Sequence, residues 1–504
     1  MPASTDGRNG CKPVWQRFLQ PFTTVHNPQQ TGDPPAAAAI LLTRSRVRTR
    51  KSKGALPRGT LKGVAPEASL NWSWLTLRVV IAATMLLLLF LSQRFWYRGL
   101  WRWSAKWGSR VLRLAARLVY VAGLLLIIAS LVDSIRNGHG RLLPRGTFLN
   151  VLAGLWFFSA LFAYLSVKVV HVLDRVWRFF RPSPKPGESH GAELDLPTDP
   201  GRRYFFKTAT AAAGAAPFLG AVYGFASERL NYQVHRVEIP VSNLPAALDG
   251  FKITQLSDIH LSGYMPRAEV RRAIAMANEL GGDLAVVTGD FITGAGDPLE
   301  DCVEEIRGLT SPLGVYGCNG NHEIYADAED RAQWLFAQAG MKLLRQQNAV
   351  LNYRGVQLNL LGVDYQRERT PGGRRMTLLS TLQPLVRSDM PNILLSHNPN
   401  SFNRAAELGV ELSLAGHTHG GQVQVEILDH RLSPARFITD YVAGLYMRPL
   451  FTPARTVASQ KFLHASTLQG PHAAIYVNRG LGTVGAPVRL GVPPEISLLV
   501  LRSA

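Results

Sequence analysis

The hydrophobic pattern divides the chain into an apolar N-terminal half and a C-terminal half of shorter alternating segments. The N-terminal half contains four apolar stretches close to the roughly 17–25 residues that a membrane-spanning helix needs. Pro217 lies in the fourth stretch, which is rich in Ala and Gly, so an Ala-rich soluble helix is the alternative there. We expect transmembrane helices at about residues 75–91, 112–132, 148–167 and 208–226.

From about residue 231 onward, short apolar runs alternate with amphipathic segments, a pattern typical of a layered α/β domain. The chain is therefore predicted to consist of a basic tail (1–70), a membrane segment (71–230) and an α/β domain (231–504). Helices are predicted at 266–280, 299–309 and 328–339. Strands are predicted at 251–256, 284–287, 314–317, 393–395 and 412–414, with further β structure at 423–427 and 496–501.

Charge separates the same two halves. Residues 1–230 contain 31 Lys and Arg against 10 Asp and Glu, whereas residues 231–504 contain 24 against 25. The basic excess thus accompanies the apolar stretches, and the α/β half lacks the basic surface that a nucleic-acid binder needs. We expect a bilayer as partner and no nucleic acid, which disfavours a nuclease.

Basic residues in the loops predict the orientation of the membrane segment. Residues 94–117 and 174–207 each carry seven Lys and Arg, so both loops should be cytoplasmic. With four spans, the α/β domain then lies on the outer, periplasmic side of a bacterial inner membrane; with three spans it would be cytoplasmic. The segment Arg202-Arg-Tyr-Phe-Phe-Lys207 resembles a twin-arginine export motif, with an ordinary basic helix flank as the alternative.

Polar side chains follow five consecutive predicted strands. The segments are Ser257-Asp-Ile-His260, Thr288-Gly-Asp290, Gly320-Asn-His-Glu323, Ser396-His397 and Gly416-His-Thr-His-Gly-Gly421. Ligands of open α/β sheets gather at the carboxyl ends of strands. Carboxylate, amide and imidazole ligands without sulfur suit Mn, Fe or Zn. Seven candidates are too many for one tetrahedral ion, so the set predicts two divalent metal ions.

In this order, the motifs Asp-x-His, Gly-Asp, Gly-Asn-His-Glu, His and Gly-His-x-His resemble the calcineurin-like metallophosphoesterase superfamily. The longer form Gly416–Gln422, with Tyr476–Gly482 near the end, is similar to its membrane-associated, exported bacterial branch. That branch includes twin-arginine-exported phosphoesterases and UDP-2,3-diacylglucosamine hydrolases. The resemblance implies a four-layer α/β/β/α sandwich over about residues 232–504.

Position by position, the resemblance implies the roles of the candidate residues. His322 would contact the phosphoryl group or donate a proton to the leaving group. Arg479 is a candidate substrate contact; it and Arg489 could equally be solvated or paired within the fold. Asp364 follows a predicted strand, where a turn cap is the ordinary role. One ion would be held by Asp258, His260 and His419, the second by Asn321, His397 and His417, with Asp290 bridging the pair.

These inferences predict a membrane-anchored phosphoric ester hydrolase that cleaves a phosphoester or pyrophosphate bond with a metal-bridging hydroxide. The membrane segment suggests a lipid-linked substrate, and the resemblance implies a nucleotide-sugar substrate as a second possibility. The alternative is a membrane sensor or transporter whose α/β domain binds metal or nucleotide without catalysis. Against it, the apolar stretches contain no acidic residue that would serve an ion path.

Overall fold

A computed structural model describes residues 72–137, 148–180, 200–365, 368–369, 375–376, 379–427, 430–437, 439–451 and 470–504. The predicted basic tail (1–70) lies outside these residues. All four predicted spans fall within long helices. These helices are α1 (Trp72–Ser104), α2 (Arg110–Asn137), α3 (Phe148–Phe179) and α4 (Pro200–Ala226).

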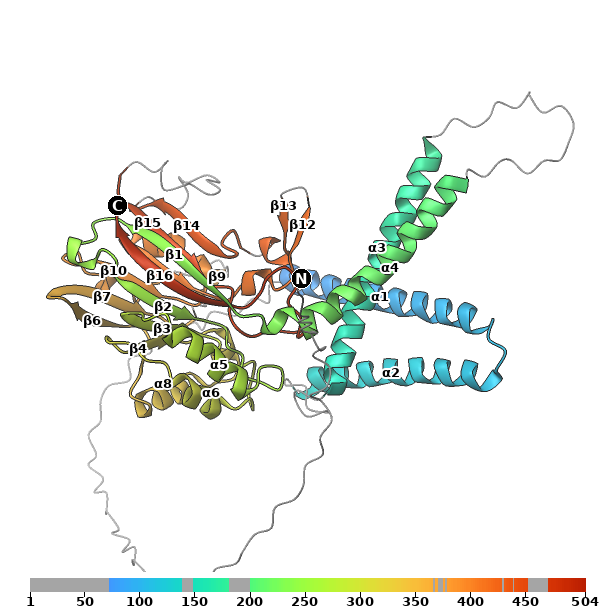
Figure 1. Cartoon of the computed structure of the whole chain (residues 1–504), viewed down its shortest axis with the longest axis horizontal. Coiled ribbons are helices and arrows are strands. Elements are labelled where there is room, and N and C mark those ends of the chain that lie inside the picture. Colours follow the sequence, from blue (N-terminus) through green and yellow to red (C-terminus); the bar gives the residue numbers. More distant parts are fainter. Residues whose placement is uncertain are drawn as a thin grey trace, which may run out of the picture. The chain divides into compact units, whose positions relative to one another are not determined.

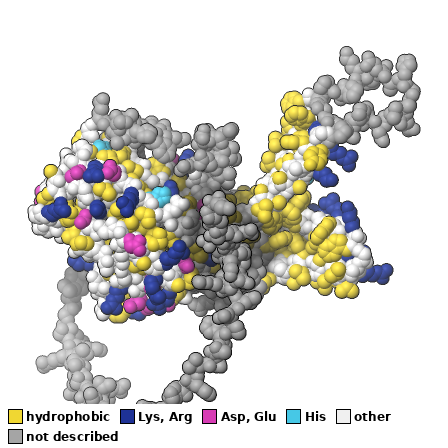
Figure 2. All heavy atoms as spheres, viewed as in Figure 1, with side chains coloured by type: hydrophobic (Ala, Val, Ile, Leu, Met, Phe, Trp, Pro, Cys, Tyr) yellow, Lys and Arg dark blue, Asp and Glu magenta, His cyan; other side chains and the backbone are white. Residues whose placement is uncertain are grey.

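The outer surface of the four helices is strongly apolar. Leu125, Phe162 and Leu219 are more than half exposed, and Figure 2 shows apolar side chains along the helices with Lys and Arg gathered near helix ends. Among the residues that the structure describes, two stretches, Gly154–Phe179 and Gly201–Leu230, are long and apolar enough to cross a membrane. They overlap the third and fourth predicted spans, whereas membrane crossing by α1 and α2 stays a prediction.

The remaining chain is a mixed α/β domain with two six-stranded sheets, as the alternating pattern predicted (Figure 1). In the first sheet, β2 to β5 run parallel, and β16 pairs antiparallel with β2 and parallel with β1. Its order is β1 (Gln233–Val241), β16 (Glu495–Ser503), β2 (Lys252–Leu256), β3 (Leu284–Thr288), β4 (Val315–Cys318) and β5 (Lys342–Leu343).

The second sheet has a parallel centre of β15, β11, β10 and β7, flanked by antiparallel β14 and β6. Of these strands, β10 and β11 were predicted with bounds, and β7 corresponds to the strand predicted before Asp364. The order is β14 (Gly444–Pro449), β15 (His472–Val477), β11 (Leu412–Ala415), β10 (Asn392–Leu395), β7 (Val356–Gly362) and β6 (Gln347–Tyr353). Short hairpins pair β12 (Val425–Ile427) with β13 (His430–Leu432) and β8 (Glu368–Arg369) with β9 (Arg375–Met376).

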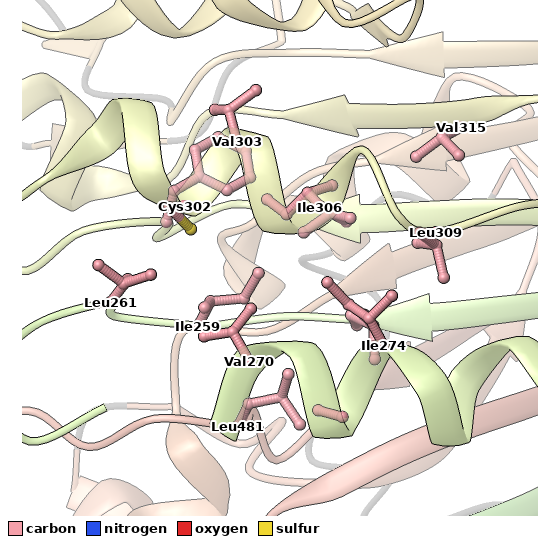
Figure 3. Packing of buried hydrophobic residues seen from close by; sticks show 14 of the residues in the cluster. Ile259, Leu261, Val270, Ile274, Cys302, Val303, Ile306, Leu309, Val315 and Leu481 are labelled. Carbon is pink, nitrogen blue, oxygen red and sulfur yellow. The ribbon is translucent and has the colours of Figure 1, made fainter. Parts of the chain in front are cut away.

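Helices pack on the sheets through clusters of buried apolar residues. One cluster of buried apolar residues joins the first sheet to α5 (Arg267–Asn278), α6 (Leu299–Ile306) and α8 (Glu329–Gln338), and a second fills the space between the two sheets. Figure 3 shows Val270 and Ile274 of α5 facing Ile306 of α6 in the first cluster. On the second sheet, α9 (Phe402–Glu407) contributes Phe402 and Ala406 to a further cluster.

The aromatic pair Phe336 and Phe291 links this core to a motif loop. Phe336 of α8 is fully buried, and its ring centroid lies 5.1 Å from that of Phe291, the residue after Asp290. We expect Phe336→Ala to lower the free energy of unfolding by about 3–5 kcal/mol. Trp334→Ala removes a half-exposed ring from the same helix and should stay within about 0.5 kcal/mol. Denaturant unfolding of the detergent-solubilised chain measures the free energy of unfolding of both variants. Equal losses of stability would contradict the assignment of Phe336 to the core.

Candidate metal centre

The predicted ligands converge where the two sheets meet. Asp258 and His260 follow β2, Asp290 follows β3, and His397 follows β10. The contact between the sheets is direct, because His397 Nδ1 lies 2.7 Å from the carbonyl oxygen of Thr288 on β3. Three groups place their potential ligand atoms within 4.8 Å of one another: Asp258, His260 and His419; His260, Asp290 and His322; and Asp290, His397 and His417.

Asp290 lies at the centre of the cluster. Its Oδ2 atom is 3.0 Å from His397 Nε2, 3.5 Å from His260 Nε2 and 4.0 Å from His322 Nε2. Its other carboxylate oxygen accepts a hydrogen bond from the His322 amide at 2.9 Å, at the start of α7 (Asn321–Tyr325). Asp290 thus belongs to two of the three groups, and its Oδ2 lies within 3.5 Å of His260, which also belongs to the group of Asp258 and His419. A ligand shared by two ions would occupy such a central position.

Asp258 holds the other end of the cluster. Its Oδ1 lies 3.4 Å from His419 Nε2, and both of its oxygens accept from the backbone amide of His417 at 3.0 and 3.1 Å. Although burial opposes it, the imidazoles of His397 and His260 hold the pKa of Asp290 well below its ordinary value, whereas burial raises the pKa of Asp258. The two carboxylates therefore form an acidic centre ringed by imidazoles.

Backbone carbonyls orient the imidazoles. The Nδ1 atoms of His260, His322 and His397 lie 3.0, 2.6 and 2.7 Å from the carbonyl oxygens of Ile292, Thr293 and Thr288. Because a carbonyl only accepts, each Nδ1 carries a proton, and each Nε2 faces the cluster, where it would offer its lone pair to a bound cation. Burial and the neighbouring His397 lower the pKa of His417 to about 4, so this ring is neutral at neutral pH.

Unpartnered atoms test whether the cluster suits metal ions. His260 Nε2, Asn321 Oδ1, His397 Nε2 and His419 Nδ1 are all buried without a hydrogen-bond partner among the described residues. Leaving such groups unsatisfied costs about 1–3 kcal/mol each, and all four belong to the predicted ligands. The donor set of nitrogen and oxygen atoms around two carboxylates fits divalent cations.

The backbone of the site is unusual as well. Left-handed φ angles between 49° and 74° occur at five of the predicted ligands: Asp258, His260, Asp290, His417 and His419. Two glycines make room for the carboxylates, since a Cβ on Gly320 would lie 2.1 Å from Asp290 Oδ1, and one on Gly416 would lie 2.2 Å from Asp258 Oδ2. Such local strain is typical of functional sites.

Glu323 is the functional residue that sequence reasoning missed. Its fully buried carboxylate accepts hydrogen bonds from the backbone amides of Gly320, Asp290, Phe291 and Ile292. Burial and the charge of Asp290 raise its pKa to about 7. The sequence does indicate one of these bonds, because Glu323 is the third residue of a helix that starts after Gly320. A carboxylate at that position commonly accepts a hydrogen bond from the backbone amide that precedes the helix.

Asp364 joins two loops, although sequence reasoning expected it to cap a turn. It accepts hydrogen bonds at 2.8 Å from Asn319 Nδ2 and from Arg345 Nε. Asn319 precedes the Gly320-Asn321 motif, so this contact connects the loop after β4 with the loop after β7.

The two candidate arginines are occupied within the fold. Arg489 is fully buried and donates to the carbonyl oxygens of Arg479, Gly480, Gly482 and Val492. Of the predicted alternatives, it is therefore paired within the fold. The Arg479 side chain itself lies 3.4 Å from Glu495 and 3.1 Å from His235. Its role as a substrate contact stays a prediction.

Comparison with known proteins agrees with this geometry. Residues 251–421 match the profile of the family described as calcineurin-like phosphoesterase. The uncharacterized metallophosphoesterase YkuE of Bacillus subtilis is 30% identical over 308 residues, which cover 60% of this chain and 98% of that protein. The chain belongs to the calcineurin-like metallophosphoesterase family.

The chain is also similar to two relatives with more specific names. A transmembrane protein with metallophosphoesterase domain from Danio rerio is 30% identical over 294 residues, 56% of this chain and 60% of that protein. The UDP-2,3-diacylglucosamine pyrophosphatase LpxG of Chlamydia muridarum is 25% identical over 327 residues, 56% of this chain and 94% of that protein. The chain thus spans less than two thirds of the length of the Danio rerio relative.

Metal binding should stabilise this metallophosphoesterase through Asp290. A saturating divalent ion at a hundredfold its dissociation constant adds about 2.7 kcal/mol per site. We expect Mn²⁺ or Zn²⁺ to raise the melting temperature of the chelator-treated chain, and Asp290→Asn to remove most of that shift. Asp301→Asn changes an exposed carboxylate outside the cluster and should keep the shift. Thermal melting checks this, and an undiminished shift in Asp290→Asn would contradict the bridging role.

Proposed function

We propose that this protein is a membrane-anchored hydrolase of phosphoester or pyrophosphate bonds that uses two divalent metal ions. The observation that carries the proposal is the convergence of three ligand groups: Asp290 is common to two of them, and His260 joins the group of Asp258 and His419 to these. Asp258, His260 and His419 would hold one ion, and Asn321, His397 and His417 the other. Bound ions, Mn, Zn or Fe by the donor set, supply an activated water and neutralise charge on the phosphoryl group.

His322 is the residue that would move a proton. Its Nδ1–H donates to Thr293, so Nε2 faces the cluster 4.0 Å from Asp290 Oδ2. Burial lowers the pKa of His322, and an anionic phosphoryl group next to Nε2 favours the charged ring in the bound state. Nε2 then protonates the leaving oxygen as the phosphorus–oxygen bond breaks.

Contacts of α4 support a site close to the membrane. Arg229, just beyond α4, donates to the carbonyl oxygen of Tyr264 at 2.7 Å, in the loop that follows His260. The Gly224 carbonyl accepts from the Arg489 amide at 3.4 Å, and the Arg489 guanidinium binds the loop beside Asp258. A ligand loop held against a membrane-span candidate favours a lipid-linked substrate, and the name of the LpxG relative favours a nucleotide sugar.

Activity of the full chain in detergent tests this function. We expect hydrolysis of bis(p-nitrophenyl) phosphate that requires added Mn²⁺ and that Asp290→Asn abolishes. His322→Asn should lower kcat by about 10²–10⁴-fold for alkyl esters. The loss should be smaller for p-nitrophenyl esters, because p-nitrophenolate leaves without a proton.

Two bound metals per chain in His322→Asn would separate the proton donor from a metal ligand, since His322 also lies in one of the three ligand groups. Metal binding without turnover on any ester or pyrophosphate would contradict the hydrolase and favour the sensor or transporter.

The membrane arrangement is a further part of the proposal: α1 to α4 cross a bacterial inner membrane, and the metal domain lies on the periplasmic side. Seven basic residues at 94–117 and seven at 174–207 support it. We expect protease added to intact spheroplasts to cleave a tag at residue 504 and to spare a tag at residue 190. The reverse pattern, or recovery of the chain in the soluble fraction, would contradict this arrangement.

A further inference from the structure

Two rows of aromatic rings extend from the metal centre, and the first ends at Tyr325. The His322 ring lies 4.7 Å from that of His260, and the Tyr325 ring follows 5.6 Å from that of His322 at an interplanar angle of 67°. Tyr325 is the last residue of α7, and 55% of its side chain is exposed. The row therefore runs from a ligand of the first ion to an accessible ring.

The second row lies on the other sheet and ends at Tyr365. The rings of His397 and His417 are 5.1 Å apart, and the Tyr365 ring lies 5.4 Å from His417 and 6.3 Å from His397. Tyr365 follows β7, and its neighbour Asp364 is fixed by Asn319 and Arg345. This row starts from ligands of the second ion, and hydrogen bonds on the preceding residue hold its end in place.

Asp290 lies between the two rows, with Oδ2 3.0 Å from His397 and 3.5 Å from His260. A phosphoryl group held above this carboxylate would be close to both rows. A phosphodiester or pyrophosphate has two substituents on the reacting phosphorus, the leaving group and the group that is retained. A monoester has only the leaving group and would use a single row.

We propose that Tyr325 and Tyr365 are specificity-determining residues that stack on ring-bearing substituents at opposite ends of one phosphodiester or pyrophosphate. This inference rests on the proposed function. Tyr325 contacts the leaving group, because it adjoins His322, whose Nε2 protonates the leaving oxygen. Tyr365 contacts the retained group, because it adjoins ligands of the other ion. The substrate class is a diester or pyrophosphate with a nucleoside, sugar or aryl ring on each side.

Two synthetic diesters separate the roles, because they share one leaving group. Bis(p-nitrophenyl) phosphate retains an aryl ring, whereas methyl p-nitrophenyl phosphate retains a methyl group. In the full chain with Mn²⁺, Tyr365→Ala should lower kcat/KM about three- to tenfold for the aryl diester and leave the methyl diester within about twofold. Tyr325→Ala should lower both by a similar factor, mainly through KM.

Matched variants distinguish ring stacking from general damage. Tyr325→Phe and Tyr365→Phe keep the rings and should lose much less kcat/KM than the Ala variants. Trp334→Ala removes an exposed ring that is paired with Arg331 on α8, and it should leave both diesters unchanged. Equal losses on both diesters in Tyr365→Ala, no loss in Tyr325→Ala, or Phe variants as impaired as the Ala variants would overturn the inference. A wild-type chain that hydrolyses neither diester would instead overturn the proposed function, and this inference with it.

Discussion

The buried carboxylate of Glu323 is the interaction on which the metal centre depends. It accepts hydrogen bonds from four backbone amides, three of them in the loop that starts at Asp290. Because those amides are buried, no water competes for them, and the loop has one well-defined conformation. That conformation directs the Asp290 side chain between His260 and His397. The proposed sharing of Asp290 by two ions therefore depends on Glu323, although Glu323 is not itself a proposed metal ligand.

Much of the domain could be predicted from the sequence because its central strands are short, buried apolar runs. β2, β3, β10 and β11 and the helices α5, α6 and α8 lie within a few residues of their predicted bounds. β6 was missed, since Gln347–Tyr353 alternates irregularly and carries polar residues at an exposed sheet edge. Its place in the sheet depends on pairing with β7, which no local pattern reveals.

For the candidate site, the ligands could be predicted from the sequence but most of the contacts that support them could not. Residues with metal-ligand chemistry could be recognised at five strand ends, and the structure brings six of the seven proposed ligands into shared groups. The position of Glu323 indicates its local bond to Gly320, but its bonds to the loop after β3 and the contacts of Asp364 join segments distant in sequence and were not predictable. The four carbonyl partners of Arg489 likewise become apparent only once the C-terminal loop is folded. Residue types that can bind metal are recognisable from the sequence alone, whereas the contacts that hold them in place depend on the folded structure.

The left-handed backbone at five proposed ligands restricts which amino acids could replace them. Besides glycine, Asn, Asp and His tolerate this conformation best, and they are also short side chains that bind cations. Backbone sterics and coordination chemistry therefore favour the same three amino acids, Asn, Asp and His, at the five positions Asp258, His260, Asp290, His417 and His419. A longer carboxylate such as Glu would be disfavoured on both counts, so exchange of one metal for another is expected to act through the surroundings of these positions rather than through the ligands themselves.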